Sequence, residues 1–270
     1  MFASPGPIFF QIGPLPIPGY GPLTLTIRWY GVLMASAMAL GLWLAYRDAR
    51  RRGVDPEELL KTSELALLGG LVGARLYYVA FSWDYYSRAL WKILAVWEGG
   101  LAIHGGILGG LLLGGLYTWW RSLPLPRYLD IIAPSLALGQ GIGRWGNFFN
   151  EEAFGTPTAL PWKLYISPPH RPLPYAQEEF FHPTFLYESL WDLLVFGLLV
   201  WVFRDRVARA PACLFWIYVG LYSVGRLVVE GFRTDSLMLG SIRVAQLASG
   251  IGIVLAILLV PLLLKRSRPA

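Results

Sequence analysis

The sequence is poor in charged residues and in cysteine. Asp, Glu, Lys and Arg make up 15% of its 270 residues, well below the roughly 25% of typical soluble domains, whereas hydrophobic residues make up 55%. A soluble fold of this length cannot cover so much apolar surface with so few polar side chains. The single cysteine, Cys213, excludes an intrachain disulfide and with it the disulfide-rich secreted class. The composition predicts an integral membrane protein.

Other absences narrow the class further. The chain has no sustained alternation of polar and apolar residues, which argues against a β-barrel, and no internal repeat of fixed period, which weakens an inverted-repeat transporter. No secretory signal is expected, because the first basic residue is Arg28 and prolines interrupt the segment before it. The three histidines lack metal-ligand spacing, and neither a phosphate-binding glycine loop nor a GxSxG motif is present. We therefore expect neither a metal nor a cofactor.

Seven apolar runs are long enough to cross about 30 Å of hydrocarbon as helices. They lie at about 27–46, 64–83, 102–120, 129–148, 183–203, 211–230 and 243–264. The sequence thus predicts an all-α, polytopic membrane protein with about seven transmembrane helices in a single integral membrane domain, 1–270. Two segments outside these runs are expected to form an extended or interfacial arm, 1–26, and a small head rich in proline and aromatic residues, 149–182.

Basic residues are divided unevenly between the two sets of loops, and this division predicts the orientation. One set, with the C-terminal tail, carries 13 Lys and Arg residues, whereas the other carries 5. Because cytoplasmic loops are enriched in Lys and Arg, we expect a cytoplasmic C-terminus. The N-terminus, the arm and the head segment are then expected outside.

Ionisable side chains inside the spans are costly in lipid, so each calls for a partner or a function. In the fourth run, Gln140, Arg144 and Asn147 fall on one helical stripe flanked by four glycines. A structural arginine paired with a carboxylate is the alternative. Such a pair requires neither the amides nor the glycine flanks, and we therefore favour a functional site.

The sixth run repeats this pattern with Tyr222, Arg226 and Glu230 at helical spacing. An ion pair along one helix would explain Glu230, but not why both charges enter the span. In the segment HPTFLYE, Glu188 and, one turn later, Asp192 are potential partners for arginines of other helices.

Two further residues are weaker candidates by themselves. His104 opens the third run, where a lone histidine is as often structural as functional, and Tyr30 lies where an aromatic belt residue is expected. With the N-terminus outside, however, Tyr30, His104, Arg144 and Arg226 all fall in the external half of their spans. Two arginines at one depth suit a phosphate, which a guanidinium binds through two parallel hydrogen bonds. The residues alone indicate an outward-facing site for an anionic amphiphile.

The segment GQGIGRWGNFFNEEAFG resembles the prolipoprotein diacylglyceryl transferase family, whose signature is close to G-R-x-G-N-F-x-N-x-E. The matching positions are Gly143, Arg144, Gly146, Asn147, Phe148, Asn150 and Glu152. The resemblance extends through IRWYG, GGLAIHGGILGG, HPTFLYES and LYSVGRLVVEGFR, and it covers all seven runs in order. The signature selects Glu152, whereas a continuous helical stripe would select Glu151, so we expect the helix to end near Asn150. Many relatives carry Gln at the position of Phe185, which is therefore expected to have no essential polar role.

The resemblance implies a transferase of the bacterial inner membrane. Such enzymes move the diacylglyceryl group of phosphatidylglycerol to the lipobox cysteine of a prolipoprotein and release glycerol phosphate. The nucleophile then belongs to the substrate: His104 is expected to take the thiol proton, and Arg144 and Arg226 to stabilise charge on the departing phosphate. The residues expected to position the lipid head and the arginines are Tyr30, Asn147, Glu152, Gly155, Tyr222 and Glu230. The implied partners are phosphatidylglycerol, the prolipoprotein signal peptide and membrane lipids, without nucleic acid.

Two other classes would use the same residues differently. A transporter or channel for anionic lipids would bind through the arginines without making a bond, and a structural membrane subunit would need only the ion pairs. Release of glycerol phosphate from phosphatidylglycerol and a lipobox peptide separates a transferase from both.

The uneven distribution of basic residues predicts a measurable topology. Reporter fusions within the loop 47–61 and after the C-terminus should report the cytoplasm, and a fusion within 149–182 should report the outside. A cytoplasmic signal from the fusion within 149–182 would reverse the predicted orientation. The polar residues of the spans could then no longer be assigned to the external half of the membrane.

Overall fold

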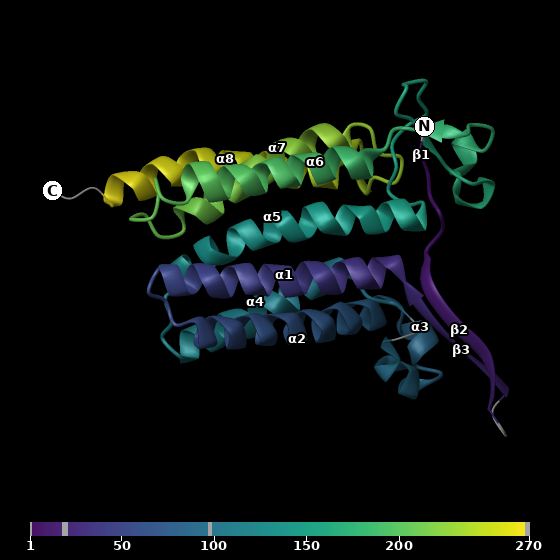
Figure 1. Cartoon of the computed structure of the whole chain (residues 1–270), viewed down its shortest axis with the longest axis horizontal. Helices are drawn as coiled ribbons and strands as arrows, with labels where there is room; N and C mark the ends of the chain where they lie inside the picture. The colour runs from purple at the N-terminus through teal and green to yellow at the C-terminus, as the bar shows by residue number, and fades with distance from the viewer. Residues whose placement is uncertain (1, 18–20, 97–98, 268–270) are drawn as a thin grey trace. The chain divides into compact units, whose positions relative to one another are not determined.

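The computed structural model describes residues 2–17, 21–96 and 99–267, and long helices dominate it (Figure 1). Met1 and residues 18–20 of the predicted arm lie outside the described residues, as does Arg268 from the predicted cytoplasmic set. The long helices are α1 (Trp29–Arg51), α2 (Pro56–Phe81), α4 (Ile103–Trp120), α5 (Leu125–Asn150), α6 (Thr184–Gly197) with its π-helical continuation η5 (Leu198–Phe203), α7 (Cys213–Glu230) and α8 (Val244–Arg266). Each predicted run coincides with one of these helices.

Side-chain hydrogen bonds explain where two of the helices begin. The α2 helix begins at Pro56, earlier than predicted, because the Asp55 carboxylate accepts hydrogen bonds from the amides of Glu57 and Glu58. At α7 the cap comes from another helix: Asp130 of α5 accepts from the amides of Ala212 and Phe215, at 2.8 and 2.9 Å. These caps satisfy amides that have no partner within their own helix.

Five of the described helices are long and apolar enough to cross a membrane: α1, α2, α6 with η5, α7 and α8. The chain is therefore a helical membrane protein, as the sequence predicts. The α4 and α5 helices have 18 and 26 residues but contain more glycine or polar residues. That α4 and α5 also cross the membrane, which would give seven spans, stays a prediction.

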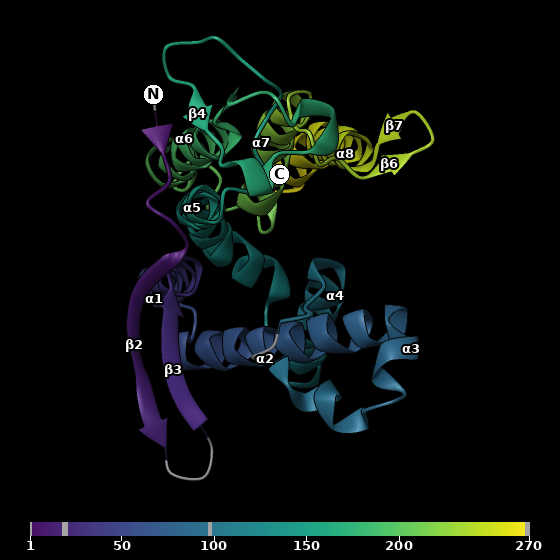
Figure 2. The same ribbon diagram turned by 90° about the vertical axis from the view of Figure 1, so that its right-hand side faces the viewer.

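Short strands occupy the segments outside the long helices. The strands β2 (Ile8–Ile17) and β3 (Gly21–Arg28) pair antiparallel and lead into α1. The strands β1 (Phe2–Ala3), β4 (Leu164–Tyr165) and β5 (Phe180–Phe181) form a three-stranded sheet within which the head segment is tied to the N-terminal end. The strands β6 (Met238–Leu239) and β7 (Ile242–Arg243) form a small hairpin before α8 (Figure 2). The short helices α3 (Trp83–Tyr86) and η1 (Leu90–Leu94) lie between α2 and α4, and η3 (Pro168–His170) and η4 (Leu173–Tyr175) lie in the head.

The chain divides into two compact units, and each is described by itself below. The first unit comprises Met1–Gly41 with Leu129–Ala270, and the second comprises Leu42–Tyr128. The second unit is built on the pair α2 and α4, whose backbones approach closely at glycines. A Cβ atom at Gly73 would overlap the carbonyl oxygen of Gly105, and one at Gly69 would overlap that of Gly109. The glycines of these two helices thus serve helix packing.

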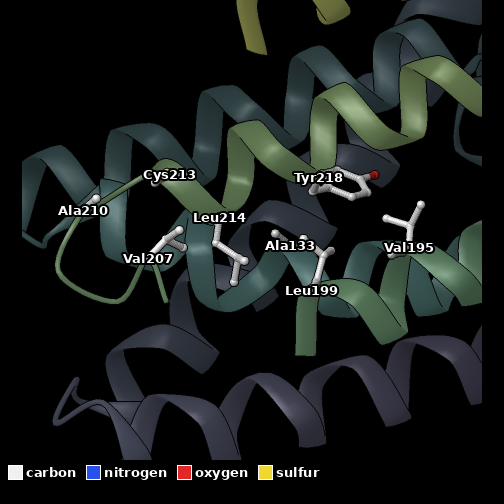
Figure 3. Close-up of a cluster of buried hydrophobic side chains, with 9 residues drawn as sticks. Ala133, Val195, Leu199, Val207, Ala210, Cys213, Leu214 and Tyr218 are labelled. Carbon is white, nitrogen blue, oxygen red and sulfur yellow. The ribbon is translucent and has the colours of Figure 1, made fainter. Parts of the chain in front are cut away.

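The core of the first unit lies among α5, η5 and α7 (Figure 3). Cys213, the first residue of α7, is fully buried there next to Leu214 and Ala210. Its surroundings are those of a small hydrophobic residue. Phe185 is also buried, in an aromatic cluster with Phe154 and Phe181, which agrees with the absence of a polar role at that position.

The close approach of α2 and α4 makes a prediction for two glycines of the same unit. Gly73→Ala should lower the unfolding temperature in detergent by roughly 3–10 °C, because the added methyl group forces the helices apart at a cost of about 1–3 kcal/mol. Gly115→Ala is the matched control, since no atom lies within 4 Å of a Cβ there, and it should leave this temperature unchanged or raise it. Equal effects at both positions would mean that the packing does not depend on these glycines.

Candidate active site

The side chain of Glu188 on α6 is the centre of a buried cluster of ion pairs. Its carboxylate contacts Arg144 Nε of α5, Arg226 Nη1 of α7 at 2.6 Å, and Arg233 Nη1, just after α7, at 3.4 Å. The Glu188 side chain is only 5% exposed. Because a buried carboxylate is strongly destabilised without partners, the cluster ties three segments of the first unit together.

A second carboxylate, that of Glu230, joins the cluster from the end of α7. It lies 2.5 Å from Arg226 Nη2, and its side chain is 1% exposed. Arg243, which precedes α8, donates a hydrogen bond to the Glu230 backbone carbonyl and so places a positive charge at the helix C-terminus, where it is favourable. The ion pair between Arg226 and Glu230 along α7 is therefore present, and Arg226 also pairs with Glu188 of α6.

Close packing of α5, α6 and α7 sets the register of these side chains. Ser189, next to Glu188, donates a hydrogen bond to the Gly141 carbonyl at 2.8 Å and accepts one from Trp145 Nε1 at 3.2 Å. On the other side of α6, the Trp191 indole lies where a Cβ at Gly225 would be. The glycines of the α5 run and of α7 thus let α6 approach closely enough for Glu188 to reach both arginines.

Arg144 retains donors that no described residue uses. Its Nε contacts Glu188, and its side chain is 20% exposed. Among the described residues no partner is found for its terminal nitrogens Nη1 and Nη2, whereas Arg226 uses both of its own on Glu188 and Glu230. The free end of a guanidinium can donate two parallel hydrogen bonds to two oxygens of one phosphate.

The end of α5 places a third carboxylate near Arg144. The helix ends at Asn150, as expected, and Glu152 folds back so that it accepts hydrogen bonds from Asn147 at 2.8 Å and Asn150 at 3.4 Å. The Tyr30 ring lies against Gly146, where a Cβ would come within 2.5 Å of it. The glycine of the signature thus makes room for the ring of Tyr30.

The neighbouring carboxylate, that of Glu151, has different partners. Its backbone has a positive φ of 52°, and its side chain accepts a hydrogen bond from the Ser167 amide at 2.9 Å and contacts His170 Nδ1 at 3.0 Å. These partners belong to the head segment. Glu152 and Glu151 thus have different partners, and the assignment of Glu152 to the site stays a prediction.

Gly155 and Tyr222 occupy positions of different character. Gly155 is closely packed: a Cβ atom at this position would come within 2.7 Å of the His182 Cβ and 3.2 Å of the Phe232 carbonyl oxygen. A role for Gly155 in positioning therefore acts through the backbone. The Tyr222 ring stacks on that of Tyr218 at 6.0 Å, one and two turns from Arg226 along α7.

The structure brings most of the expected site residues into one unit. Tyr30, Arg144, Asn147, Glu152, Gly155, Tyr222, Arg226 and Glu230 all belong to the first unit, whereas His104 belongs to the second. His104 is the second residue of α4, and its ring lies 6.1 Å from that of Tyr77 on α2.

Sequence reasoning left two members of the cluster out of the expected site. Glu188 was weighed only as a partner for arginines, and Arg233 was given no role. The signal for Glu188 was a carboxylate inside an apolar run, which requires a buried cation. Its central place depends on three segments meeting, which no local pattern reveals.

Comparisons with known proteins show which proteins the chain is similar to. The family model described as "Prolipoprotein diacylglyceryl transferase" matches residues 7–262. The chain is similar to proteins named phosphatidylglycerol–prolipoprotein diacylglyceryl transferase in three cyanobacteria. Identity is 51% for Synechococcus elongatus over 95% of this chain and 87% of the relative, and 48% for Trichormus variabilis over 100% and 93%. For Thermosynechococcus vestitus it is 50% over 86% of each chain.

Removal of the Glu188 charge should destabilise the first unit. Glu188→Gln leaves three partly buried guanidinium groups without their common carboxylate, which we expect to lower the unfolding temperature by at least about 5 °C, since breaking a buried ion pair costs about 3–5 kcal/mol. Glu178→Gln, on the exposed surface of the head segment, is the control and should have no effect. A Glu188→Gln variant as stable as the parent would contradict a structural role for the cluster.

Proposed function

The chain belongs to the prolipoprotein diacylglyceryl transferase family, and from this premise we propose that it transfers the diacylglyceryl group of phosphatidylglycerol to the lipobox cysteine of a prolipoprotein. The names of the relatives state both substrates. In the reaction the thiol sulfur bonds to the glycerol carbon that carries the phosphate. The bond between that carbon and the phosphate oxygen breaks, and its electron pair leaves on glycerol phosphate. This is the first step of bacterial lipoprotein maturation.

The unpaired end of Arg144 is the observation that carries the proposed chemistry. Glu188 holds Arg144 and Arg226 side by side, while Nη1 and Nη2 of Arg144 have no partner among the described residues. A phosphate that takes these donors comes next to Arg226 without breaking the buried pairs. Donors fixed before the reaction stabilise charge that grows on the leaving phosphate and need no reorganisation during the step. In this proposal Glu188 positions the two arginines, and they stabilise the leaving group.

The thiol proton requires a separate acceptor, because the thiolate is the reactive form of cysteine. We assign this role to His104, because an imidazole ring nitrogen can accept a proton in a reaction near neutral pH. Tyr30, Asn147, Glu152, Gly155, Tyr222 and Glu230 are proposed to position the lipid head and the arginines. Hydrogen bonds between Asn147 and Glu152 and ion pairs between Arg226 and Glu230 support this assignment. No residue of this chain is proposed as a covalent nucleophile.

We further propose that the protein lies in the bacterial inner membrane with its N-terminus outside and its C-terminus in the cytoplasm. The arm 1–26 and the head segment 149–182 then lie on the external side, where an exported prolipoprotein presents its lipobox. The membrane location rests on the apolar helices, and the orientation rests on the uneven distribution of Lys and Arg.

Substitution of the arginines by lysine tests the leaving-group role. Lysine keeps the charge but loses the planar pair of donors, so Arg144→Lys and Arg226→Lys should each lower the release of glycerol phosphate at saturating phosphatidylglycerol by at least about 100-fold, roughly 2.7 kcal/mol of barrier. Binding of phosphatidylglycerol should change much less, because several groups share it. The assay uses purified protein, phosphatidylglycerol vesicles and a lipobox peptide.

Cys213→Ser is the control for this assay, since the buried thiol is expected to take no part and the variant should keep most of the activity. Lysine variants that react at parental rates, or that lose rate only through lost lipid binding, would refute the leaving-group role. Loss of turnover in a folded Cys213→Ser protein would indicate a covalent enzyme intermediate instead of direct transfer.

A further inference from the structure

Arg75 on α2 is a buried arginine that the proposed reaction does not use. Its residue is 4% exposed, and among the described residues no carboxylate pairs with it. All five N–H groups of its guanidinium instead donate to backbone carbonyls. Nε donates to Ile93 at 2.9 Å, Nη1 to Gly99 at 2.5 Å and Gly100 at 3.0 Å, and Nη2 to Lys92 at 2.5 Å and Ala95 at 3.1 Å.

The five carbonyl groups belong to the segment that leads into α4. This segment therefore wraps around the positively charged guanidinium of Arg75. Gly99 and Gly100 have positive φ values of 86° and 71°, which turn their carbonyl groups toward the guanidinium at little steric cost. A Cβ at Gly100 would come within 2.8 Å of Arg75 Nη1 and of the Tyr78 ring. The ring of Tyr86 also lies 5.1 Å from the Arg75 guanidinium, where it stabilises the charge.

Lysine could not replace this arginine. An ammonium group has three donors and no planar fork, so at least two of the five carbonyls would lose their partner, and a buried unpaired carbonyl is costly. The conformation of residues 92–96 and 99–100 therefore depends on the guanidinium itself.

Two residues separate the segment held by Arg75 from the first turn of α4, which contains His104. The Ala102 amide donates to the carbonyl of Ala74, the residue before Arg75, at 3.0 Å. The α4 helix begins at the next residue, Ile103, and His104 follows. We propose that Arg75 is a positioning residue for His104, holding the start of α4 in the place that proton transfer requires. This inference rests on the proposed role of His104 as the base.

A double-mutant cycle of Arg75 and His104 tests the inference by turnover at saturating phosphatidylglycerol and lipobox peptide. We expect Arg75→Lys to lower turnover by about 10-fold or more, and His104→Gln by about 100-fold or more. If Arg75 acts through His104, adding Arg75→Lys to the His104→Gln protein should lower turnover by less than 3-fold, because the group that it positions is already absent. The control is Arg121→Lys, at an exposed ion pair with Glu58 in the same unit, which should keep turnover within about 2-fold.

Gly100→Ala disrupts the same contacts from the other side and covers the case in which Arg75→Lys fails to fold. It should show the same lack of additivity with His104→Gln, and the amides of residues 92–102 should exchange hydrogen faster in it than in the Gly115→Ala control.

The outcomes separate the inference from the proposed function. Losses that multiply in the double variants, or parental turnover in Arg75→Lys or Gly100→Ala, overturn the positioning role and leave the base assignment intact. Parental turnover in His104→Gln overturns the base assignment and the positioning role together. Small additional losses in both double variants support the inference.

Discussion

The buried carboxylate of Glu188 is the constraint on which the rest of the candidate site depends. A single negative charge inside an apolar helix would be strongly destabilising, and three arginines, one from α5, one from α7 and one just after α7, offset it. In turn, the arginines could not approach one another without the carboxylate between them, because like charges at that distance repel. The cluster therefore specifies how α5, α6 and α7 fit together in the first unit.

Such a cluster suits the stabilisation of a leaving phosphate better than it suits simple binding. Free arginine side chains would have to be ordered when the lipid arrives, at an entropic cost, whereas these are held by Glu188 and Glu230 beforehand. Close packing also helps to hold the site residues in place. Gly141, Gly146 and Gly225 lie where a larger residue would push a neighbouring helix or the Tyr30 ring away. In the proposed reaction, these donors are already in place when charge develops on the phosphate.

Sequence reasoning succeeded where the signal was local. Hydropathy placed the helices, and helical spacing grouped Arg144 with Asn147 and Arg226 with Glu230. The end of α5 at Asn150 was expected from the family signature and is confirmed. Reasoning from sequence failed where the determinant was a contact between distant segments. Glu188 lies at the centre of the cluster only because α5, α6 and α7 meet there. Arg75 is bound by five backbone carbonyl groups, and which carbonyls bind a side chain cannot be predicted from the identity of the residues that carry them. The cap of α7 by Asp130 was missed for the same reason.

The central claim is that Arg144 stabilises the charge on the leaving phosphate. The most direct test compares phosphatidylglycerol with an analogue in which sulfur replaces the oxygen bridging the reacting glycerol carbon and the phosphorus, since this leaving group depends less on hydrogen-bond donors. The ratio of parental to Arg144→Lys turnover is measured for both lipids at saturation. We predict that this ratio is at least about 10-fold smaller for the sulfur analogue, because the lost donors matter less to it. The same ratio for both lipids would contradict the claim and make Arg144 an anchor for the bound lipid.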